Sequence, residues 1–145
     1  MDSALHNGLL HAHSGLRWVV LVLLVTAIAQ AFGNKETALT KSNRKIELFA
    51  MIFTHIQLII GLVLYFLPQS KNNLSEPFLD AATRFYTVEH LVGMLIAIAL
   101  ITVGHSKAKK SESFKPIATY YLIGLIIILA SIPWPFREGL AGGWF

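Results

Sequence analysis

The chain has 145 residues, of which 54% are hydrophobic and only 14% are charged, and its mean hydropathy is +0.59. These values lie outside the range of soluble globular domains and indicate a membrane protein. The sequence contains no cysteine, which excludes disulfides, iron–sulfur clusters, thiolate-ligated haem and covalent haem attachment. Any metal is therefore expected to be bound by histidine, methionine or oxygen ligands.

Four long apolar runs have about the length, roughly 17 to 25 residues, that a helix needs to cross the hydrocarbon core of a bilayer. The runs lack the alternation of apolar and polar residues that a membrane strand shows, so helices are expected. The sequence predicts an all-α integral membrane protein, with the whole chain forming one up-and-down four-helix bundle. The predicted spans cover approximately residues 16–33, 46–67, 85–104 and 117–134.

Basic residues are concentrated in the first and third loops between the predicted spans, and these are Lys35, Lys41, Arg44, Lys45, Lys107, Lys109, Lys110 and Lys115. Short basic loops remain in the cytoplasm, so we expect both loops inside and the two termini and the middle loop outside. The net charge of +4 is then a signal of topology and does not indicate nucleic-acid binding.

Two features mark the predicted outer side. In the middle loop, Ser75, Glu76 and Pro77 form a start signal for a helix that leads into the third span. All three tryptophans fall at the outer membrane interface, as expected for an aromatic belt, and these are Trp18, Trp134 and Trp144.

Histidines inside the spans are candidates for function, because ionisable groups are costly in a membrane. A rise of about 1.5 Å per residue places His13 about 30 Å, His90 about 22 Å and His55 about 15 Å from the inner side. His90 can therefore share a ligand with either neighbour, whereas His13 and His55 differ too much in depth to bind one iron. For His55, a quinone or proton contact and a buried, hydrogen-bonded role remain equally open.

One face of the third span carries Tyr86, His90, Gly93, Ala97 and Gly104. The surface beside His90 is thus lined by small side chains. Such a stripe favours one of two interpretations: close packing of helices, or a flat porphyrin lying against the face whose histidine ligates it.

Arg17 lies one helical turn from His13, at the outer edge of the first span. If a haem is bound there, Arg17 is well placed to contact its propionates, and Arg84 and Arg137 reach the same level. The alternative is that Arg17 extends to the phosphate groups of the lipid.

Glu89 points about 100° away from His90 around the third helix. We expect this carboxylate to pair with Arg17, or else to have a raised pKa or carry protons. The remaining histidines of the spans, His11 and His105, are expected to lie at the surface.

The chain resembles, over nearly its whole length, a family of small bacterial four-span proteins labelled "cytochrome B", and the matching segments are HAHSGLRW, FTHIQLIIGLVLYF, RFYTVEHLVGMLIAIALITVGHSKAKK and IPWPFR. More distantly, its layout is similar to one four-helix half of haem A synthase. The family resemblance implies a b-type haem held by histidines in the bacterial inner membrane, with electrons passing to or from quinone or a partner complex. It rests on His13, Arg17, His55, Glu89 and His90.

The leading hypothesis is a membrane cytochrome that binds one noncovalent haem b near the outer face and transfers electrons, without a substrate of its own. His90 is the first expected iron ligand, and His13 or His55 is the second. The other residues expected at the cofactor are Arg17, Tyr86, Glu89 and Gly93.

Two further classes of function stay open. The chain is alternatively a cofactor-free accessory subunit of a larger membrane complex, in which the small-residue stripes are docking surfaces. It is otherwise a protein that handles copper or haem, with weak, exchangeable ligands at His6, His11, His13 and Met94.

Overall fold

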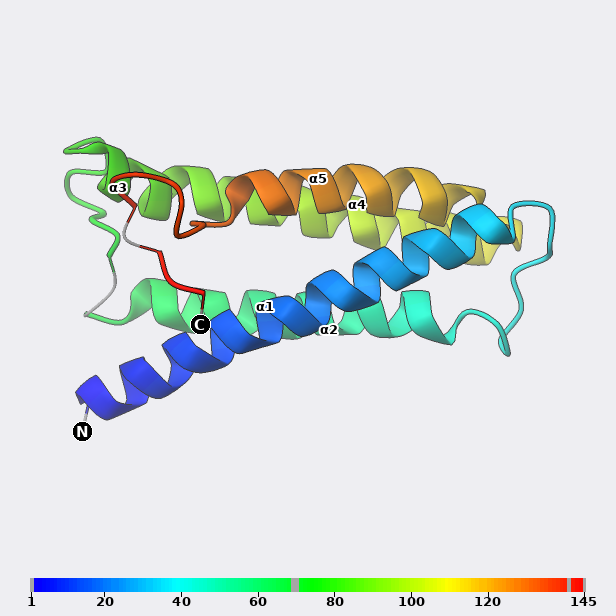
Figure 1. Cartoon of the computed structure of the whole chain (residues 1–145), viewed down its shortest axis with the longest axis horizontal. Coiled ribbons are helices and arrows are strands. Elements are labelled where there is room, and N and C mark those ends of the chain that lie inside the picture. The colour runs from blue at the N-terminus through cyan, green and yellow to red at the C-terminus, as the bar shows by residue number, and fades with distance from the viewer. Residues whose placement is uncertain (1, 69–70, 141, 145) are drawn as a thin grey trace.

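A computed structural model describes residues 2–68, 71–140 and 142–144, and their regular secondary structure is helical, with one isolated β-bridge in addition. Three helices are long and apolar enough to cross a membrane, and a fourth apolar helix, Ile117–Ser131, is shorter. These helices indicate a multi-pass membrane protein. Figure 1 shows the long helices running along the longest axis of the molecule.

The helices follow the predicted spans, but three of the four differ from the prediction at one end or both. Helix α1 (Asp2–Gly33) begins well before residue 16, so the histidines near the N-terminus are helical. Helix α2 (Lys45–Phe66) matches the second predicted span closely. The third span is one continuous helical segment, made of α3 (Ala81–Arg84), the π-helix η1 (Phe85–Glu89) and α4 (His90–Ser111).

The fourth predicted span consists of a π-helix, η2 (Ile117–Tyr121), followed by α5 (Leu122–Ser131). It ends before residue 134, because Ile132 is extended, with φ −79° and ψ 134°. A residue that precedes proline is disfavoured in helical conformation, and Pro133 follows Ile132. The chain then turns back across this end of the helices as an irregular C-terminal segment, residues 132–140 and 142–144 (Figure 1).

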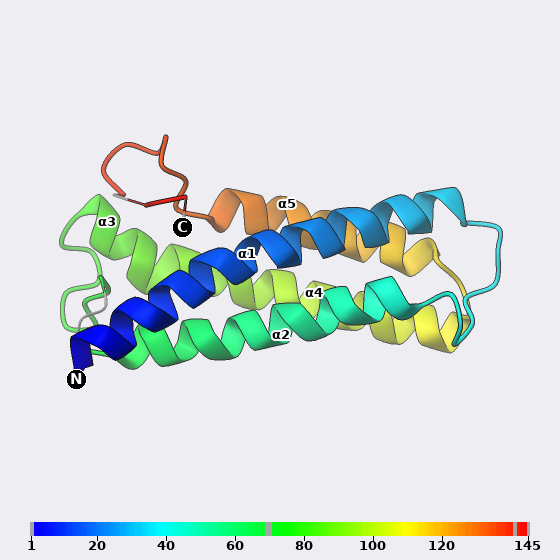
Figure 2. The ribbon, with the colours of Figure 1, turned by 60° about the horizontal axis from the view of Figure 1, so that its bottom comes forward.

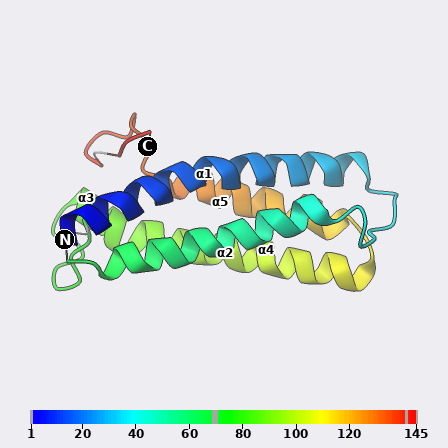
Figure 3. The ribbon, with the colours of Figure 1, turned by 90° about the horizontal axis from the view of Figure 1, so that it is seen from below.

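Helix α1 packs mainly on α2, and α4 packs mainly on η2 and α5. The two pairs also contact each other, α2 with α4 and α1 with η2 and α5. Figure 2 and Figure 3 show this arrangement from two further directions, with α1 beside α2 and the ends of the chain at one end of the molecule.

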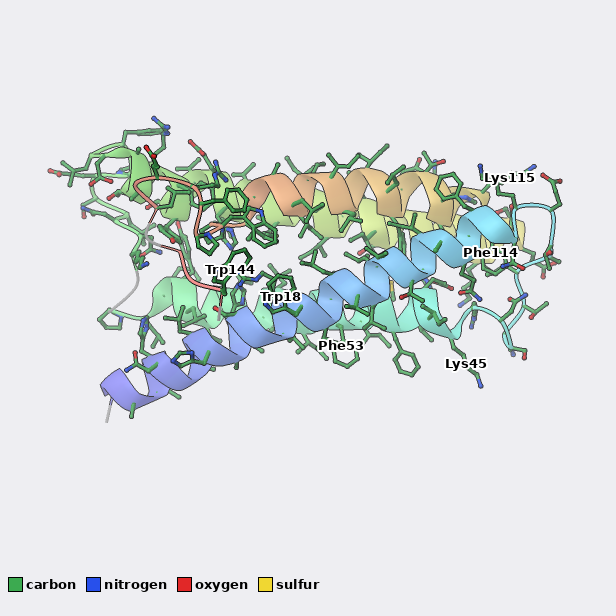
Figure 4. The ribbon with its side chains drawn as sticks, in the orientation of Figure 1. Trp18, Lys45, Phe53, Phe114, Lys115 and Trp144 are labelled. Carbon is green, nitrogen blue, oxygen red and sulfur yellow. The ribbon has the colours of Figure 1, made fainter. Side chains whose placement is uncertain are left out.

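The two basic loops lie together at the other end of the molecule. An antiparallel β-bridge joins Ala38 of the loop after α1 to Ser113 of the loop after α4. Lys45 and Lys115 mark this end in Figure 4, far from the C-terminal segment. Both basic loops therefore belong to the same side, as the charge pattern predicts.

The third helical segment begins later than the predicted start signal at Ser75. Asp80 caps it, since its carboxylate accepts a 2.8 Å hydrogen bond from the backbone N–H of Thr83. This hydrogen bond lowers the pKa of the exposed Asp80 carboxyl. Asp80, and not Ser75, is the N-cap residue, because it directly precedes the first helical residue, Ala81.

The small-residue stripe of the third span is used for helix packing. A Cβ atom on Gly104 would lie 2.6 Å from the Cβ of Tyr120 in η2, and one on Gly93 would collide with Ser131 in α5. Ala97 on the same stripe is fully buried. This stripe is therefore covered within the chain, which removes it as a docking surface for another subunit.

We predict that Gly104→Ala destabilises the protein, because the added methyl group forces α4 away from η2. Overpacking of this kind costs about 1–3 kcal/mol. The matched control is Gly15→Ala, since a Cβ at Gly15 has no atom within 4 Å. Thermal unfolding in detergent should show a lower Tm for Gly104→Ala alone, and equal Tm values for the two variants would contradict the packing described here.

Candidate functional site

A cavity of about 440 Å³ lies between α1, α2 and α4, at the end of the molecule that carries both termini. The C-terminal segment forms part of its wall through Pro133, Gly142 and Gly143. Most of the lining is apolar, and the main polar residues are His6, His13, Arg17, Gln57, Lys71, Asn72, Tyr86 and His90. This cavity brings polar residues from α1, α2 and the third helical segment together at one end of the molecule.

His13 and His90 face each other in this cavity. Their ring centroids are 6.3 Å apart, and the ring planes are inclined by 69°. One ring comes from α1 and the other from α4, two helices that contact α2 more than each other. The His13 ring fits because the residue of α2 beside it is a glycine, Gly61. A Cβ atom at Gly61 would lie 2.9 Å from Cε1 of His13.

The orientation of His90 is set by a hydrogen bond to the end of α5. Its Nδ1 lies 2.7 Å from the carbonyl oxygen of Ser131. A carbonyl only accepts, so Nδ1 carries the proton and the lone pair is on Nε2. The carbonyl is available because it belongs to the last turn of α5, where helical partners are missing.

Four residues of the cavity lining have a buried polar side-chain atom with no hydrogen-bond partner among the described residues. They are Nδ1 of His6, Nδ1 of His13, Nε of Arg17 and Oε1 of Gln57. The other end of the Gln57 amide donates a 2.7 Å hydrogen bond to the carbonyl oxygen of His13. Each unsatisfied buried group costs about 1–3 kcal/mol, so these atoms favour a ligand with polar groups of its own.

Arg17 is only 9% exposed and lies where the cavity meets the C-terminal segment. It donates hydrogen bonds to the carbonyl oxygens of Trp144, at 2.6 Å, and Gly143, at 3.3 Å. Its guanidinium also lies 5.5 Å and 5.6 Å from the ring centroids of Trp18 and Trp134. The three tryptophans gather around this arginine, and Figure 4 shows Trp18 and Trp144 close together.

The predicted ion pair between Glu89 and Arg17 was wrong. Glu89 pairs with Arg84 instead, with 2.6 Å between Oε1 and Nε, and its side chain is 44% exposed. The reason is the π-helix η1, whose wide turn with i→i+5 hydrogen bonds brings residues five apart onto one side. Glu89 therefore lies outside the cavity lining.

Two other residues expected at the cofactor also lie away from this cavity. His55 is hydrogen-bonded elsewhere, with Nδ1 2.8 Å from the carbonyl oxygen of Met51 and Nε2 3.3 Å from the hydroxyl of Thr102. Gly93 packs against Ser131. The predicted residues that the structure does bring together in the lining are His13, Arg17, Tyr86 and His90.

The predicted outer arginines have partners of their own. Arg84 is engaged by Glu89, and Arg137 donates a 2.9 Å hydrogen bond to the carbonyl oxygen of Ala130. A cation that the sequence pattern did not single out, Lys71, lines the cavity, with Nζ 5.2 Å from the ring centroid of Tyr86. Its only signal in the sequence was its position in the middle loop, where Arg84 is the one other basic residue.

Of the two histidines expected at the surface, His11 is exposed and His105 is not. Nδ1 of His105 lies 2.6 Å from Oε2 of Glu47, whose side chain is 1% exposed. The prediction for His105 was wrong because this histidine pairs with Glu47, a buried carboxylate near the start of α2.

Comparison with protein-family models, curated proteins and solved structures yields no match for this chain. Within the described residues, no group of three or more histidine, aspartate or glutamate side chains is arranged to hold a metal ion. The two facing histidines are thus a pair without a third protein ligand of these types. A metal bound between them needs further ligands from another source.

We predict that Arg17→Gln loosens the C-terminal segment, because it removes charge-assisted hydrogen bonds worth about 1.5–3 kcal/mol each. Carboxypeptidase digestion followed by mass spectrometry should release the last residues at least about tenfold faster than in the wild type. The control is Arg84→Gln, which removes an arginine of the exposed pair and leaves this segment intact. Equal digestion rates for both variants would contradict the role of the Arg17 hydrogen bonds in holding the C-terminal segment in place.

Proposed function

We propose that the protein is a membrane cytochrome, an up-and-down four-helix bundle that holds one noncovalent haem b between His13 and His90. One observation carries this proposal, the 6.3 Å between the two ring centroids. A metal lies about 2 Å from a nitrogen that ligates it, and that nitrogen lies about 1 Å from the centre of its imidazole ring. Two imidazoles that bind one metal would therefore have ring centroids about 6 Å apart. With this spacing, His13 and His90 would be able to hold one iron together.

The donor set also fits a porphyrin. Two imidazoles supply the axial ligands of a b-type haem, and the porphyrin itself supplies the other four. The hydrogen bond from Nδ1 of His90 to Ser131 leaves Nε2 as the ligating nitrogen. The cavity, of about 440 Å³, is mostly apolar, as expected for a cofactor site.

Two cations of the lining would hold the acidic edge of the cofactor. Arg17 and Lys71 both line the cavity, and a haem carries two propionate groups for which cations are suitable partners. The apolar lining and the C-terminal segment would exclude water from the iron. When bound, haem supplies one-electron transfer, and we infer that the electrons pass to or from quinone or a respiratory partner.

We further propose a location in a bacterial inner membrane with both termini outside. Support comes from the two basic loops, which lie together at one end, and from the tryptophans, which gather at the other. Basic loops remain on the cytoplasmic side and tryptophans favour the membrane interface. The haem would then lie near the outer face.

The first test of the cytochrome is the visible spectrum of the purified protein in detergent. We expect a Soret band, with sharper α and β bands after reduction with dithionite, as for a low-spin haem with two histidine ligands. A featureless spectrum from protein produced with ample haem would overturn the proposal and favour a cofactor-free accessory subunit.

The ligand assignment is tested by single variants of the histidines. His90→Ala and His13→Ala should each lose this spectrum, because each removes one axial ligand. His55→Ala and the exposed control His11→Ala should retain it. Loss of the spectrum in His55→Ala but not in His13→Ala would show that the pair is His90 with His55.

Copper handling is the second candidate, and one observation favours it. Met94 lines the same cavity as His13 and His90, and a thioether with two imidazoles is a suitable ligand set for Cu(I). This candidate predicts bound copper, measured by elemental analysis, in protein that has no Soret band.

The topology can be tested by cysteine labelling, since the natural chain has no cysteine. Ser113→Cys lies in a basic loop and Ser75→Cys lies in the middle loop. In intact spheroplasts, we expect a membrane-impermeant maleimide to label Ser75→Cys and to label Ser113→Cys only after lysis. The reverse pattern would contradict the proposed orientation.

A further inference from the structure

The end of the molecule that carries the basic loops has an open pocket between the end of α4 and the start of η2. Its volume is about 470 Å³, and it is lined by Lys107, Lys110 and Ser111 of α4 and by Pro116, which directly precedes η2. None of these residues lines the cavity of the proposed haem site. Lys107 lies within one helical turn of the predicted end of the third span, so the pocket is expected at the level of the lipid headgroups.

The ammonium group of Lys107 is held at this pocket by a side chain of η2. Its Nζ donates a 2.7 Å hydrogen bond to the hydroxyl of Tyr120 and lies 5.0 Å from the centroid of the same ring. A lysine side chain loses rotamer freedom when it is fixed on a ligand, and the contact with Tyr120 has already restricted Lys107. An ammonium group has three N–H donors, so two of them remain for an anion.

The positive charge of the pocket is not balanced by a carboxylate. Among the described residues, neither Lys107 nor Lys110 forms an ion pair, whereas Lys115 does, with 3.7 Å between its Nζ and Oε1 of Glu36. Glu112 follows the pocket residues of α4 in the chain, but it is exposed and does not belong to the lining. Two like charges one helical turn apart repel each other, so the pocket favours an anion that binds both lysines.

Exposed apolar side chains continue from this pocket into the membrane-spanning part of the two helices. Val103 lies four residues before Lys107, and Ile123 lies three residues after Tyr120, so each is about one turn deeper on the same side of its helix. The two helices touch at this level, where a Cβ atom on Gly104 would lie 2.6 Å from the Cβ of Tyr120. Val103 is 43% exposed and Ile123 is 44% exposed. This side of the molecule is therefore positively charged at its end and apolar beneath.

We propose that the pocket binds the headgroup of an anionic phospholipid, whose acyl chains lie against Val103 and Ile123. Lys107 and Lys110 supply charge and hydrogen bonds to the phosphate, for which lysine is a suitable partner. Tyr120 is a positioning residue that holds Lys107. Basic pockets between membrane helices bind acidic lipid headgroups, and the apolar surface beneath the charge fits a lipid rather than a free phosphate ion. This inference goes beyond the proposed function, since it requires neither the haem nor the proposed orientation.

The test is lipid binding to the purified protein, measured by native mass spectrometry in a mild detergent. The protein is titrated with phosphatidylglycerol, which has a net negative charge, and with phosphatidylcholine, which has the same acyl chains and no net charge. We expect phosphatidylglycerol to bind at least about tenfold more tightly, because only its headgroup has a net charge that the lysines can neutralise. Equal affinities for the two lipids would overturn the proposal.

Two double variants distinguish the pocket from a general attraction of anions to this end of the molecule. Lys107→Gln/Lys110→Gln should bind phosphatidylglycerol at least about tenfold more weakly than the wild type. The matched control is Lys41→Gln/Lys109→Gln, which removes two charges from the same end without changing the lining, and it should keep the wild-type affinity. All four lysines are exposed, so both variants should fold, as circular dichroism and gel filtration will show. Equal losses of affinity in the two double variants would overturn the pocket as the binding site.

Inorganic phosphate, which has no acyl chains, distinguishes a lipid site from a phosphate site. It should not displace phosphatidylglycerol, and displacement would show that the pocket recognises phosphate alone, which would overturn the lipid as its ligand.

The positioning role of Tyr120 is tested by Tyr120→Phe, which keeps the ring and removes the hydroxyl. This variant should bind phosphatidylglycerol about threefold more weakly in the wild-type background, as expected for the loss of one hydrogen bond. It should have no further effect in a Lys107→Gln background, because the hydroxyl acts through Lys107. The same loss in both backgrounds would contradict this role.

Discussion

The hydrogen bond from His90 to the carbonyl oxygen of Ser131 is the contact on which the cavity end of the molecule depends. It forms because α5 ends at Ser131, ahead of Pro133, and leaves a carbonyl without a helical partner. It also requires the close approach of α4 and α5 at Gly93. The bond engages Nδ1 of His90 and leaves Nε2 unengaged by it, on a ring whose centroid lies 6.3 Å from that of His13.

Three charged groups near or inside the membrane are stabilised in three different ways. Glu89 is turned to the surface and paired with Arg84. Arg17 is buried against backbone carbonyls and tryptophan rings rather than against a carboxylate. Glu47 is enclosed and depends on His105. Only the last two are costly to bury, and Arg17 lies beside the cavity for which we propose a function.

The two ends of the molecule are chemically different. One end has a mostly apolar cavity with facing imidazoles and two cations in its lining, and the other has a buried acid–base pair beneath two basic loops. A π-helix lies at each end. At the cavity end, η1 directly precedes His90, and at the other end η2 carries Tyr121. A π-helical turn shifts the following side chains around the helix, and such turns are frequent at functional sites.

The sequence by itself determined the helical class, the approximate positions of the apolar helices and the common end of the basic loops, because apolar runs and loop charge are local properties. It also identified His13, Arg17, Tyr86 and His90, since polar residues inside a span are few. Only the tertiary structure decided the partners of Glu89, His55 and His105. Those partners depend on π-helical turns and on close approaches between helices, which change the direction of a side chain without leaving a periodic signal in the sequence.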